Sequence, residues 1–229
     1  MEKLALIIPA AGSGSRLKRE TPKPYIKICD ATILEHTIRP FTQLDNLCKV
    51  VIATSQTYLQ EAEKIAKKAV SDFVEVVIVE GGAERQDSIY NALQTIKVAD
   101  LTAIHDAVRP FILPSQIRAC CNSATVVGAA IIAVPAKDTI KQVGKNNIIQ
   151  STPDRSTLWQ AQTPQIFQTD IIKEAYAKAK TDGIVGTDDA SLVEYLGNDV
   201  KVVEGSRENF KITYPLDLQV ANTLLENHE

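Results

Sequence analysis

The sequence lacks the features that mark membrane, secreted and nucleic-acid-binding proteins. No apolar run reaches the length of a membrane span, and the first residues lack the basic-then-apolar pattern of a signal peptide. The four cysteines show no C-x-x-C spacing and have apolar neighbours, which predicts buried, reduced thiols. A net charge of −3 argues against a general nucleic-acid binder, because such proteins carry a basic excess. We therefore expect a cytoplasmic protein that binds neither membrane nor nucleic acid.

Two familiar glycine-rich phosphate loops are also missing. No segment matches the Walker A pattern G-x-x-x-x-G-K-[ST]. The pair Gly12-x-Gly14 is followed by Leu17, where a dinucleotide fingerprint requires Gly or Ala. These absences argue against a P-loop nucleotidase and against a nicotinamide-dependent dehydrogenase.

Length and composition fit a globular α/β protein. A chain of 229 residues suffices for one large domain or two small ones, and its 45% apolar and 23% charged content are ordinary. Apolar runs of strand length alternate with helical segments, which predicts a mostly parallel sheet with helices on both faces. We expect strands over residues 4–8, 49–54, 73–79, 101–104, 129–134, 201–204 and 209–213, and helices over 32–41, 60–70, 89–96, 169–180 and 215–225. No internal repeat or low-complexity linker divides the chain, so we expect one domain over residues 1–229.

The loop after the first predicted strand is the strongest candidate for a ligand site. Residues 9–15 are small apart from Pro9, so backbone N–H groups there can approach a ligand closely. Positive charge follows at once, from Arg16, Lys18, Arg19 and Lys23. N–H groups combined with fixed cations suit a polyphosphate. The competing interpretation is an ordinary strand–loop–helix turn with exposed basic residues.

Two further segments follow predicted strands, where ligand sites form in sheets of this kind. After residue 80, the sequence GGAERQDS offers Ser88 for a base edge and Arg85 for a carboxylate; the alternative is a glycine turn with a helix cap. After residue 104, Asp106 could reach a metal ion or a sugar hydroxyl, or form a structural ion pair with Arg109. His105 has no metal-ligating partner at a suitable spacing, so we expect it to be structural.

Two later segments have mainly structural interpretations. Asp188 and Asp189 are expected to cap a helix rather than bind a cation. Two short alternating segments flank the turn Gly144-Lys145-Asn146-Asn147, which predicts a β-hairpin. One domain would cover the polar faces of this hairpin poorly. We therefore expect it to project as an arm, about residues 136–157, with edges that invite pairing with another chain.

These segments, in this order, resemble the 2-C-methyl-D-erythritol 4-phosphate cytidylyltransferases, enzymes of the non-mevalonate isoprenoid pathway. The resemblance spans essentially the full length and rests on PAAGSGSRL, PKPY, TILEHTI, GGAERQDSI, HDAVRP, AVPAKDTIK, LWQAQTPQ, TDDAS and EGSRENFKIT. Many sugar-nucleotide pyrophosphorylases share the first motif, whereas HDAVRP, TPQ and ENFKIT together are far more specific. The resemblance implies a Rossmann-like α/β nucleotidyltransferase fold and a homodimer in which each arm hooks over the partner subunit.

The resemblance also implies a reaction, in which CMP passes from CTP to methylerythritol phosphate and pyrophosphate is released. Such a transfer requires positioning and charge neutralisation rather than a protein nucleophile. The implied catalytic residues are Arg16, Lys23, Arg155 and Lys211. The implied nucleotide-binding residues are Ala10, Ala11, Gly12, Gly82, Ser88 and Asp106. The implied substrate-binding residues are Arg109, Thr139, Arg155, Thr187 and Lys211, of which Thr139 and Arg155 would serve the neighbouring subunit.

The resemblance further implies Mg²⁺ as cofactor, held mainly by the CTP phosphates with Asp106 nearby, so no residue is assigned as a direct ligand. One departure is Ala83, where family members often carry Asp, so a contact made by that carboxylate would be missing. Two alternatives stay open: cytidylyl transfer to another polyol phosphate such as ribitol 5-phosphate, and a nucleotide-binding module without turnover. The second would be expected to have lost at least one cation, yet Arg16, Lys23, Arg155 and Lys211 are all present.

Overall fold

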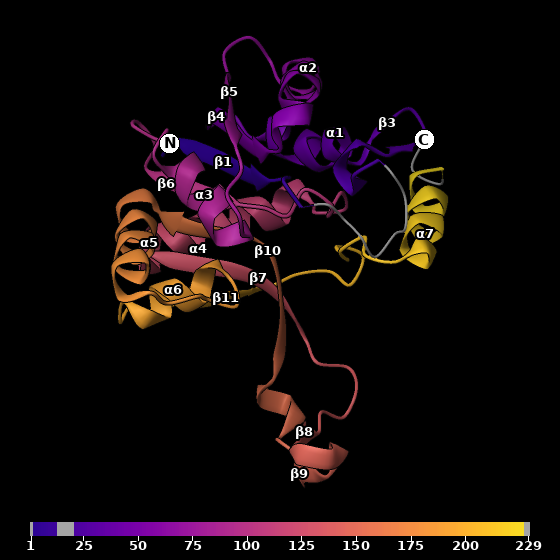
Figure 1. Cartoon of the computed structure of the whole chain (residues 1–229), viewed down its shortest axis with the longest axis vertical. Coiled ribbons are helices and arrows are strands. Elements are labelled where there is room, and N and C mark those ends of the chain that lie inside the picture. The colour runs from indigo at the N-terminus through magenta and orange to yellow at the C-terminus, as the bar shows by residue number, and fades with distance from the viewer. Residues whose placement is uncertain (1, 13–20, 227–229) are drawn as a thin grey trace.

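The centre of the computed structural model, which describes residues 2–12 and 21–226, is one seven-stranded sheet (Figure 1). In spatial order its strands are β11 (Lys201–Glu204), β7 (Ala129–Pro135), β10 (Trp159–Gln168), β6 (Leu101–Ile104), β1 (Leu4–Pro9), β4 (Leu47–Thr54) and β5 (Glu75–Glu80). All neighbours pair in parallel except β10, which is antiparallel to both β6 and β7.

Helices cover both faces of the sheet because its central strands are apolar on both sides. In β1, Leu4, Leu6 and Ile8 belong to one buried cluster, whereas Ala5 and Ile7 belong to the other, as the alternation of side chains along a strand requires. The first cluster includes residues of α1 (Ile33–Ile38), α2 (Leu59–Ala69) and α4 (Pro114–Val127). The second includes residues of α3 (Arg85–Leu93), α5 (Thr169–Asp182) and α6 (Asp189–Tyr195). The predicted mostly parallel sheet with helices on both faces is confirmed.

A third, smaller cluster fixes the C-terminal part of the described chain near the end of β6. It joins α7 (Pro215–Glu226) to β2 (Lys27–Ile28), to Val108 and to Ile212. The strand β3 (Ala31–Thr32) pairs with β2 beside it. Short 3₁₀ helices occupy Lys23–Tyr25, Arg39–Gln43, Gln56–Tyr58, Lys145–Asn147 and Arg155–Thr157.

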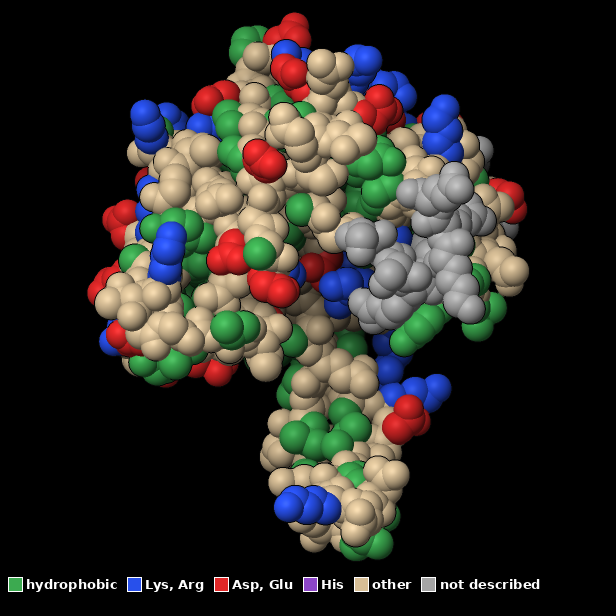
Figure 2. Space-filling model, viewed as in Figure 1, with side chains coloured by type: hydrophobic (Ala, Val, Ile, Leu, Met, Phe, Trp, Pro, Cys, Tyr) green, Lys and Arg blue, Asp and Glu red, His purple; other side chains and the backbone are tan. Residues whose placement is uncertain are grey.

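The predicted arm is present and projects from the body of the molecule (Figure 1). It leaves the sheet after β7, forms a hairpin from β8 (Gln142–Val143) and β9 (Ile149–Ser151), and returns through β10. Hydrophobic side chains lie on its surface (Figure 2), among them Ile148 at 66% and Ile149 at 56% exposure. The arm lies between the end of β7 at Pro135 and the start of β10 at Trp159. The expected single domain with an arm over about residues 136–157 stays a prediction.

Several expectations about elements were wrong. Residues 209–213 are not a strand: in this segment Ile212 donates one backbone hydrogen bond, to Val108 O at 2.9 Å, and no ladder forms. The strand expected from residue 73 begins at Glu75, and Phe73 is 95% exposed. Neither α4 nor β10 was expected from the sequence.

The four cysteines, all among the described residues, form no disulfide, but their burial differs from the expectation. Cys120 and Cys121 lie on the buried face of α4, as predicted, whereas Cys48 is half-buried and Cys29 is exposed. Burial raises the pKa of Cys121 to about 12, so this thiol is inert. Across residues 2–12 and 21–226, no helix is both long and apolar enough to cross a membrane.

Candidate active site

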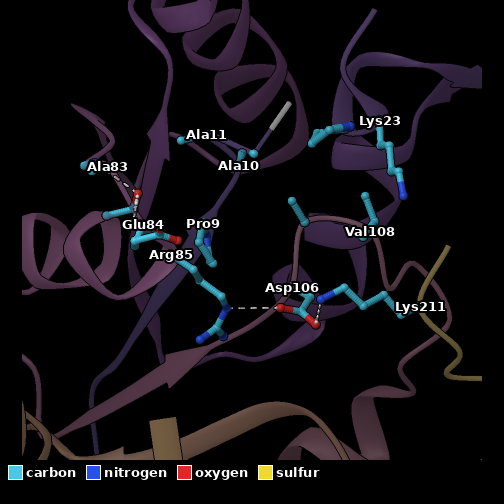
Figure 3. A pocket seen from close by; sticks show the side chains of 15 residues that line it. Pro9, Ala10, Ala11, Lys23, Ala83, Glu84, Arg85, Asp106, Val108 and Lys211 are labelled. Carbon is cyan, nitrogen blue, oxygen red and sulfur yellow. Dashed lines mark hydrogen bonds and ion pairs between the residues drawn. The ribbon is translucent and has the colours of Figure 1, made fainter. Parts of the chain in front are cut away.

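A pocket of about 570 Å³ lies where the parallel strands end (Figure 3). Ligand sites in open α/β sheets form at this edge because the loops after neighbouring strands meet there. Its walls come from segments far apart in the sequence, namely residues 9–12 after β1, 23–24, 82–85 and 88 after β5, 106–108 after β6, and Lys211.

The loops after β1 and β5 form the first wall, and small residues allow them to pack together. The Ala10 N–H donates to Ala53 O at 2.7 Å, and the Gly81 N–H donates to Thr54 O at 2.8 Å, so both loops are fixed to the end of β4. A Cβ atom on Gly81 would overlap that of Ala11. Glycine at position 81 is therefore required by this close approach.

Ser88 lines the same wall but uses its hydroxyl within the loop. Its Oγ accepts from the Gly82 N–H at 3.0 Å and donates to Glu84 O at 3.1 Å. Asp87 accepts from the Glu84 N–H at 3.2 Å at the start of α3. The glycine turn with a helix cap is therefore present. Because the same residues line the pocket, the structural interpretation and the ligand-site interpretation of this segment are compatible.

Asp106 lies at the centre of the pocket and is surrounded by cations. Its Oδ2 lies 3.0 Å from Lys211 Nζ and 3.3 Å from Arg109 Nε, and its Oδ1 lies 3.6 Å from Arg85 Nε. Figure 3 shows Arg85 and Lys211 approaching it from opposite sides. Burial alone would raise the pKa of Asp106, but attraction to Lys211, Arg85 and Arg109 outweighs it and lowers that pKa. The ion pair between Asp106 and Arg109, one of the two sequence-based interpretations, is confirmed.

His105 is structural, as predicted. It is fully buried, with Nε2 3.0 Å from Arg109 O and Nδ1 2.9 Å from the Thr163 hydroxyl. That hydroxyl also accepts from the Asp106 N–H at 3.0 Å. Burial is the main cause that lowers the pKa of His105 to about 4. The imidazole is therefore neutral near pH 7 and positions the backbone of Asp106.

The segments carrying the three most specific motifs meet behind the pocket. Arg109 donates to Asn209 O at 2.7 Å, and the Asn209 side-chain amide donates to Thr163 O at 2.9 Å and to Gln162 Oε1 at 3.0 Å. HDAVRP, TPQ and ENFKIT thus form one hydrogen-bonded network around Asp106. The network fixes the backbone from which Lys211 reaches the pocket.

Lys23 adds a further cation, on the wall opposite the loops after β1 and β5. Its side chain is buried, and its Nζ donates to Thr213 O at 2.7 Å. Thr213 lies two residues from Lys211, so the C-terminal segment connects both lysines. Arg16, the other predicted cation of this wall, lies outside the described residues.

The structure brings most of the predicted site residues together. Those that line the pocket are Ala10, Ala11, Gly12, Lys23, Gly82, Ser88, Asp106 and Lys211. Arg109 adjoins them through Asp106. Thr139 and Arg155 lie on the arm, where Arg155 donates to Lys137 O at 2.8 Å, and Thr187 is exposed in the turn before α6. These last three do not line the pocket of the described chain.

Sequence reasoning missed the partner of Arg85. Asp188 caps α6 as predicted, because its Oδ1 accepts from the Ser191 N–H at 2.9 Å. Asp189 was also expected to cap, but it is fully buried and binds both terminal nitrogens of Arg85. The only available signal was that Arg85 is the single cation in GGAERQDS.

The arrangement suits a polyphosphate better than a bare metal ion. Among residues 2–12 and 21–226, no three His, Cys, Asp or Glu side chains gather as metal ligands. Of the two carboxylates that line the pocket, Asp106 is buried and Glu84 is exposed. Mg²⁺ is commonly bound by one or two carboxylates together with substrate phosphates. The residues present therefore fit Mg²⁺ if a nucleotide supplies most of its ligands.

Comparisons with known proteins agree with this geometry. A relative from Symbiobacterium thermophilum, named 2-C-methyl-D-erythritol 4-phosphate cytidylyltransferase, is 40% identical over 225 residues, which cover 97% of this chain and 93% of the relative. A relative of the same name from Syntrophotalea carbinolica is 42% identical over 226 residues, which cover 96% of this chain and 95% of the relative. The crystal structure of 4-diphosphocytidyl-2C-methyl-D-erythritol synthase from Anaerococcus prevotii is 29% identical, with a TM-score of 0.86 over 98% of this chain and 96% of that one. The family model for 2-C-methyl-D-erythritol 4-phosphate cytidylyltransferase matches residues 4–227, and the chain belongs to this family.

Proposed function

We propose that this protein transfers CMP from CTP to 2-C-methyl-D-erythritol 4-phosphate and releases pyrophosphate, a step of isoprenoid biosynthesis. Family membership over residues 4–227 is the observation that carries the proposal. The pocket supports it, because its cations and backbone donors suit in-line attack on a phosphorus atom. No protein nucleophile is needed for such a reaction.

In this proposal each wall of the pocket has a separate task. The loops carrying Ala10, Ala11, Gly12, Gly82 and Ser88 bind the nucleotide, with Asp106 next to its ribose and phosphates. Lys23, together with Arg16, neutralises the triphosphate as charge builds at the α-phosphorus. Lys211 and Arg109 meet the phosphate of the acceptor from the other side of Asp106.

Magnesium belongs to the proposal as well. The CTP phosphates would hold most of the ion's coordination, with Asp106 nearby, and the ion would supply charge neutralisation on the phosphate oxygens. Chelation by EDTA is therefore expected to stop turnover, and added MgCl₂ to restore it. Turnover that persists in EDTA with metal-free protein would contradict this requirement.

A homodimer with exchanged arms completes the site. Arg155 and Thr139 lie on the arm, outside the pocket of their own chain, and hydrophobic side chains cover the tip of that arm. An arm that docks on a second copy would bury these side chains and bring Arg155 and Thr139 to the partner's acceptor phosphate, where Thr187 would join them. We place this dimer in the cytoplasm, which fractionation of cells can test.

The deciding experiment measures pyrophosphate release from CTP and MgCl₂ with either methylerythritol 4-phosphate or ribitol 5-phosphate. Release with methylerythritol phosphate alone is expected. Release with ribitol phosphate instead would keep the mechanism and change the acceptor. Silence with both, from folded protein that binds CTP, would overturn the proposal in favour of a nucleotide-binding module.

A further inference from the structure

The guanidinium of Arg85 lies between the carboxylates of Asp189 and Asp106 and contacts them with different geometry. Its Nη1 donates to Asp189 Oδ1 at 3.0 Å and its Nη2 to Asp189 Oδ2 at 2.7 Å. Only Nε faces Asp106, at 3.6 Å, which exceeds hydrogen-bond distance. Arg85 therefore gives its bidentate pair to Asp189, on the side away from the pocket centre.

Asp189 is a rigid support for this pair. It is fully buried in the first turn of α6, and its Oδ1 also accepts a hydrogen bond from the Tyr176 hydroxyl on α5. The neighbouring Gln165 of β10 fixes the same turn, because its amide donates to Asp188 Oδ2 at 2.8 Å and accepts from the Ala190 N–H at 2.9 Å. The carboxylate of Asp189 thus has little freedom to move.

The electrostatics show why the choice of partner matters. Burial works against the charge of Arg85, but the attraction of Asp189 outweighs burial and raises the pKa of Arg85. Arg85 is therefore always charged. If Asp189 were neutral, Asp106 would be the nearest carboxylate, and bidentate pairing is the geometry that guanidinium groups prefer.

We propose that Asp189 is a positioning residue for nucleotide binding. By holding both terminal nitrogens of Arg85, it prevents Arg85 from forming a bidentate pair with Asp106, which would block that carboxylate from a ligand. Lys211 and Arg109 already occupy Oδ2 of Asp106. The other oxygen, Oδ1, stays accessible to a ligand only while Arg85 is bound to Asp189. The inference rests on the proposed function, since it concerns how CTP reaches Asp106.

The variant Asp189→Asn tests this directly, because it keeps the size of the side chain and an acceptor for Tyr176 but removes the charge. We expect the KM for CTP to rise roughly tenfold, as for other residues that orient a ligand-binding group, with a smaller change in kcat. Calorimetry with CTP alone should show the same loss of affinity. The matched control is Tyr176→Phe, which removes one hydrogen bond to Asp189 but keeps its charge and both of its bonds to Arg85, and it should leave the KM for CTP at the wild-type value.

A double-mutant cycle separates positioning from a merely structural role. In an Arg85→Gln background no guanidinium can close on Asp106, so adding Asp189→Asn should cause no further rise in KM. An equal rise in both backgrounds would overturn the proposal, as would a wild-type KM for folded Asp189→Asn. If Asp189→Asn does not fold, Asp189→Ser decides, because it also removes the carboxylate that holds both terminal nitrogens of Arg85; an unchanged KM for CTP in that folded variant also overturns the proposal.

Assays of the wild-type enzyme distinguish failure of the proposed function from failure of the proposed role of Asp189. Wild-type protein that releases no pyrophosphate would defeat the proposed function. Active wild-type protein with an Asp189→Asn variant of unchanged KM would defeat only the role of Asp189.

Discussion

At the scale of single residues, the pocket depends on charges whose partners are fixed. Asp106 has Lys211 and Arg109 on one oxygen and Arg85 near the other, so its orientation is set before any ligand arrives. Asp106 and Arg109 are three positions apart, and their pairing could be inferred from sequence. Arg85 and Asp189 are separated by 104 positions, and no local pattern connects them.

His105 makes the stability of the protein dependent on pH. The folded chain binds a proton on this imidazole only near pH 4, whereas the unfolded chain binds one near pH 6.5. The unfolded state therefore holds more protons between these values, and stability falls as the pH drops through that window. Between about pH 7.5 and about pH 5 we expect His105 to account for a loss of about 2 kcal/mol.

Urea unfolding of wild type and His105→Gln at both pH values measures the contribution of His105 to the pH dependence of stability. The variant is less stable at either pH because it loses the contacts to Arg109 and Thr163. Its further loss on acidification should be smaller than that of wild type by about 2 kcal/mol. An equal loss in both proteins would show that His105 does not titrate as described.

At the scale of elements, the connection between β5 and α3 depends on glycine. A Cβ atom on Gly82 would overlap the Cβ of Asp87 in the first turn of α3. We therefore expect Gly82→Ala to displace the loop, to weaken CTP binding and to cost about 1–3 kcal/mol of stability, as overpacking does. Calorimetry with CTP and urea unfolding measure the two effects.

Gly12→Ala is the matched control for stability. No heavy atom of the described residues lies within 4 Å of a Cβ atom placed on Gly12. Its free energy of unfolding should equal that of wild type. A Gly82→Ala variant as stable as Gly12→Ala would mean that the loop adapts without strain.

The elements that sequence predicts well are those whose own residues explain their burial. The apolar runs of β1 and β4 identify strands buried on both faces. β10 was missed because its middle, Gln162-Thr163-Pro164-Gln165, is mostly polar. These polar side chains are nevertheless buried, and they form hydrogen bonds to distant segments. α4 buries Ile117, Cys120, Cys121 and Ala124 at helical spacing, and this pattern of mostly small residues was overlooked.

At the scale of the whole molecule, the proposed arm exchange would build each site from parts of two chains. Its tip exposes Ile148 and Ile149, and Arg155 lies in its returning segment, shortly before β10. Sequence predicted the arm from its turn and its alternating pattern, but the pocket of one chain lacks the arm residues. Neither sequence nor a single chain places Arg155 at a substrate, so that role remains a prediction that mixing experiments can test.

Mixed dimers of Lys23→Ala and Arg155→Ala chains test arm exchange. Each variant alone should lose about 100-fold or more in turnover, as for loss of one donor to a transition state. Random mixing gives half mixed dimers, each with one intact site, so about a quarter of wild-type activity should return. Pyrophosphate release after exchange of subunits measures it.

The control mixes Lys23→Ala with Lys211→Ala. Both lysines line the pocket of one chain, so no mixed dimer contains an intact site. No activity should return in this mixture. Failure of the first mixture to exceed the second, in verified mixed dimers, would contradict arm exchange.

The continuity of β10 has a mechanical consequence. The strand starts at Trp159, directly after the last turn of the arm, and runs into the sheet between β6 and β7. Its Thr163 hydroxyl accepts from the Asp106 N–H. β10 is one strand from Trp159 to Gln168, so no separate loop lies between the end of the arm and Thr163. A displacement of the docked arm would therefore be expected to reach the backbone of Asp106 through this strand.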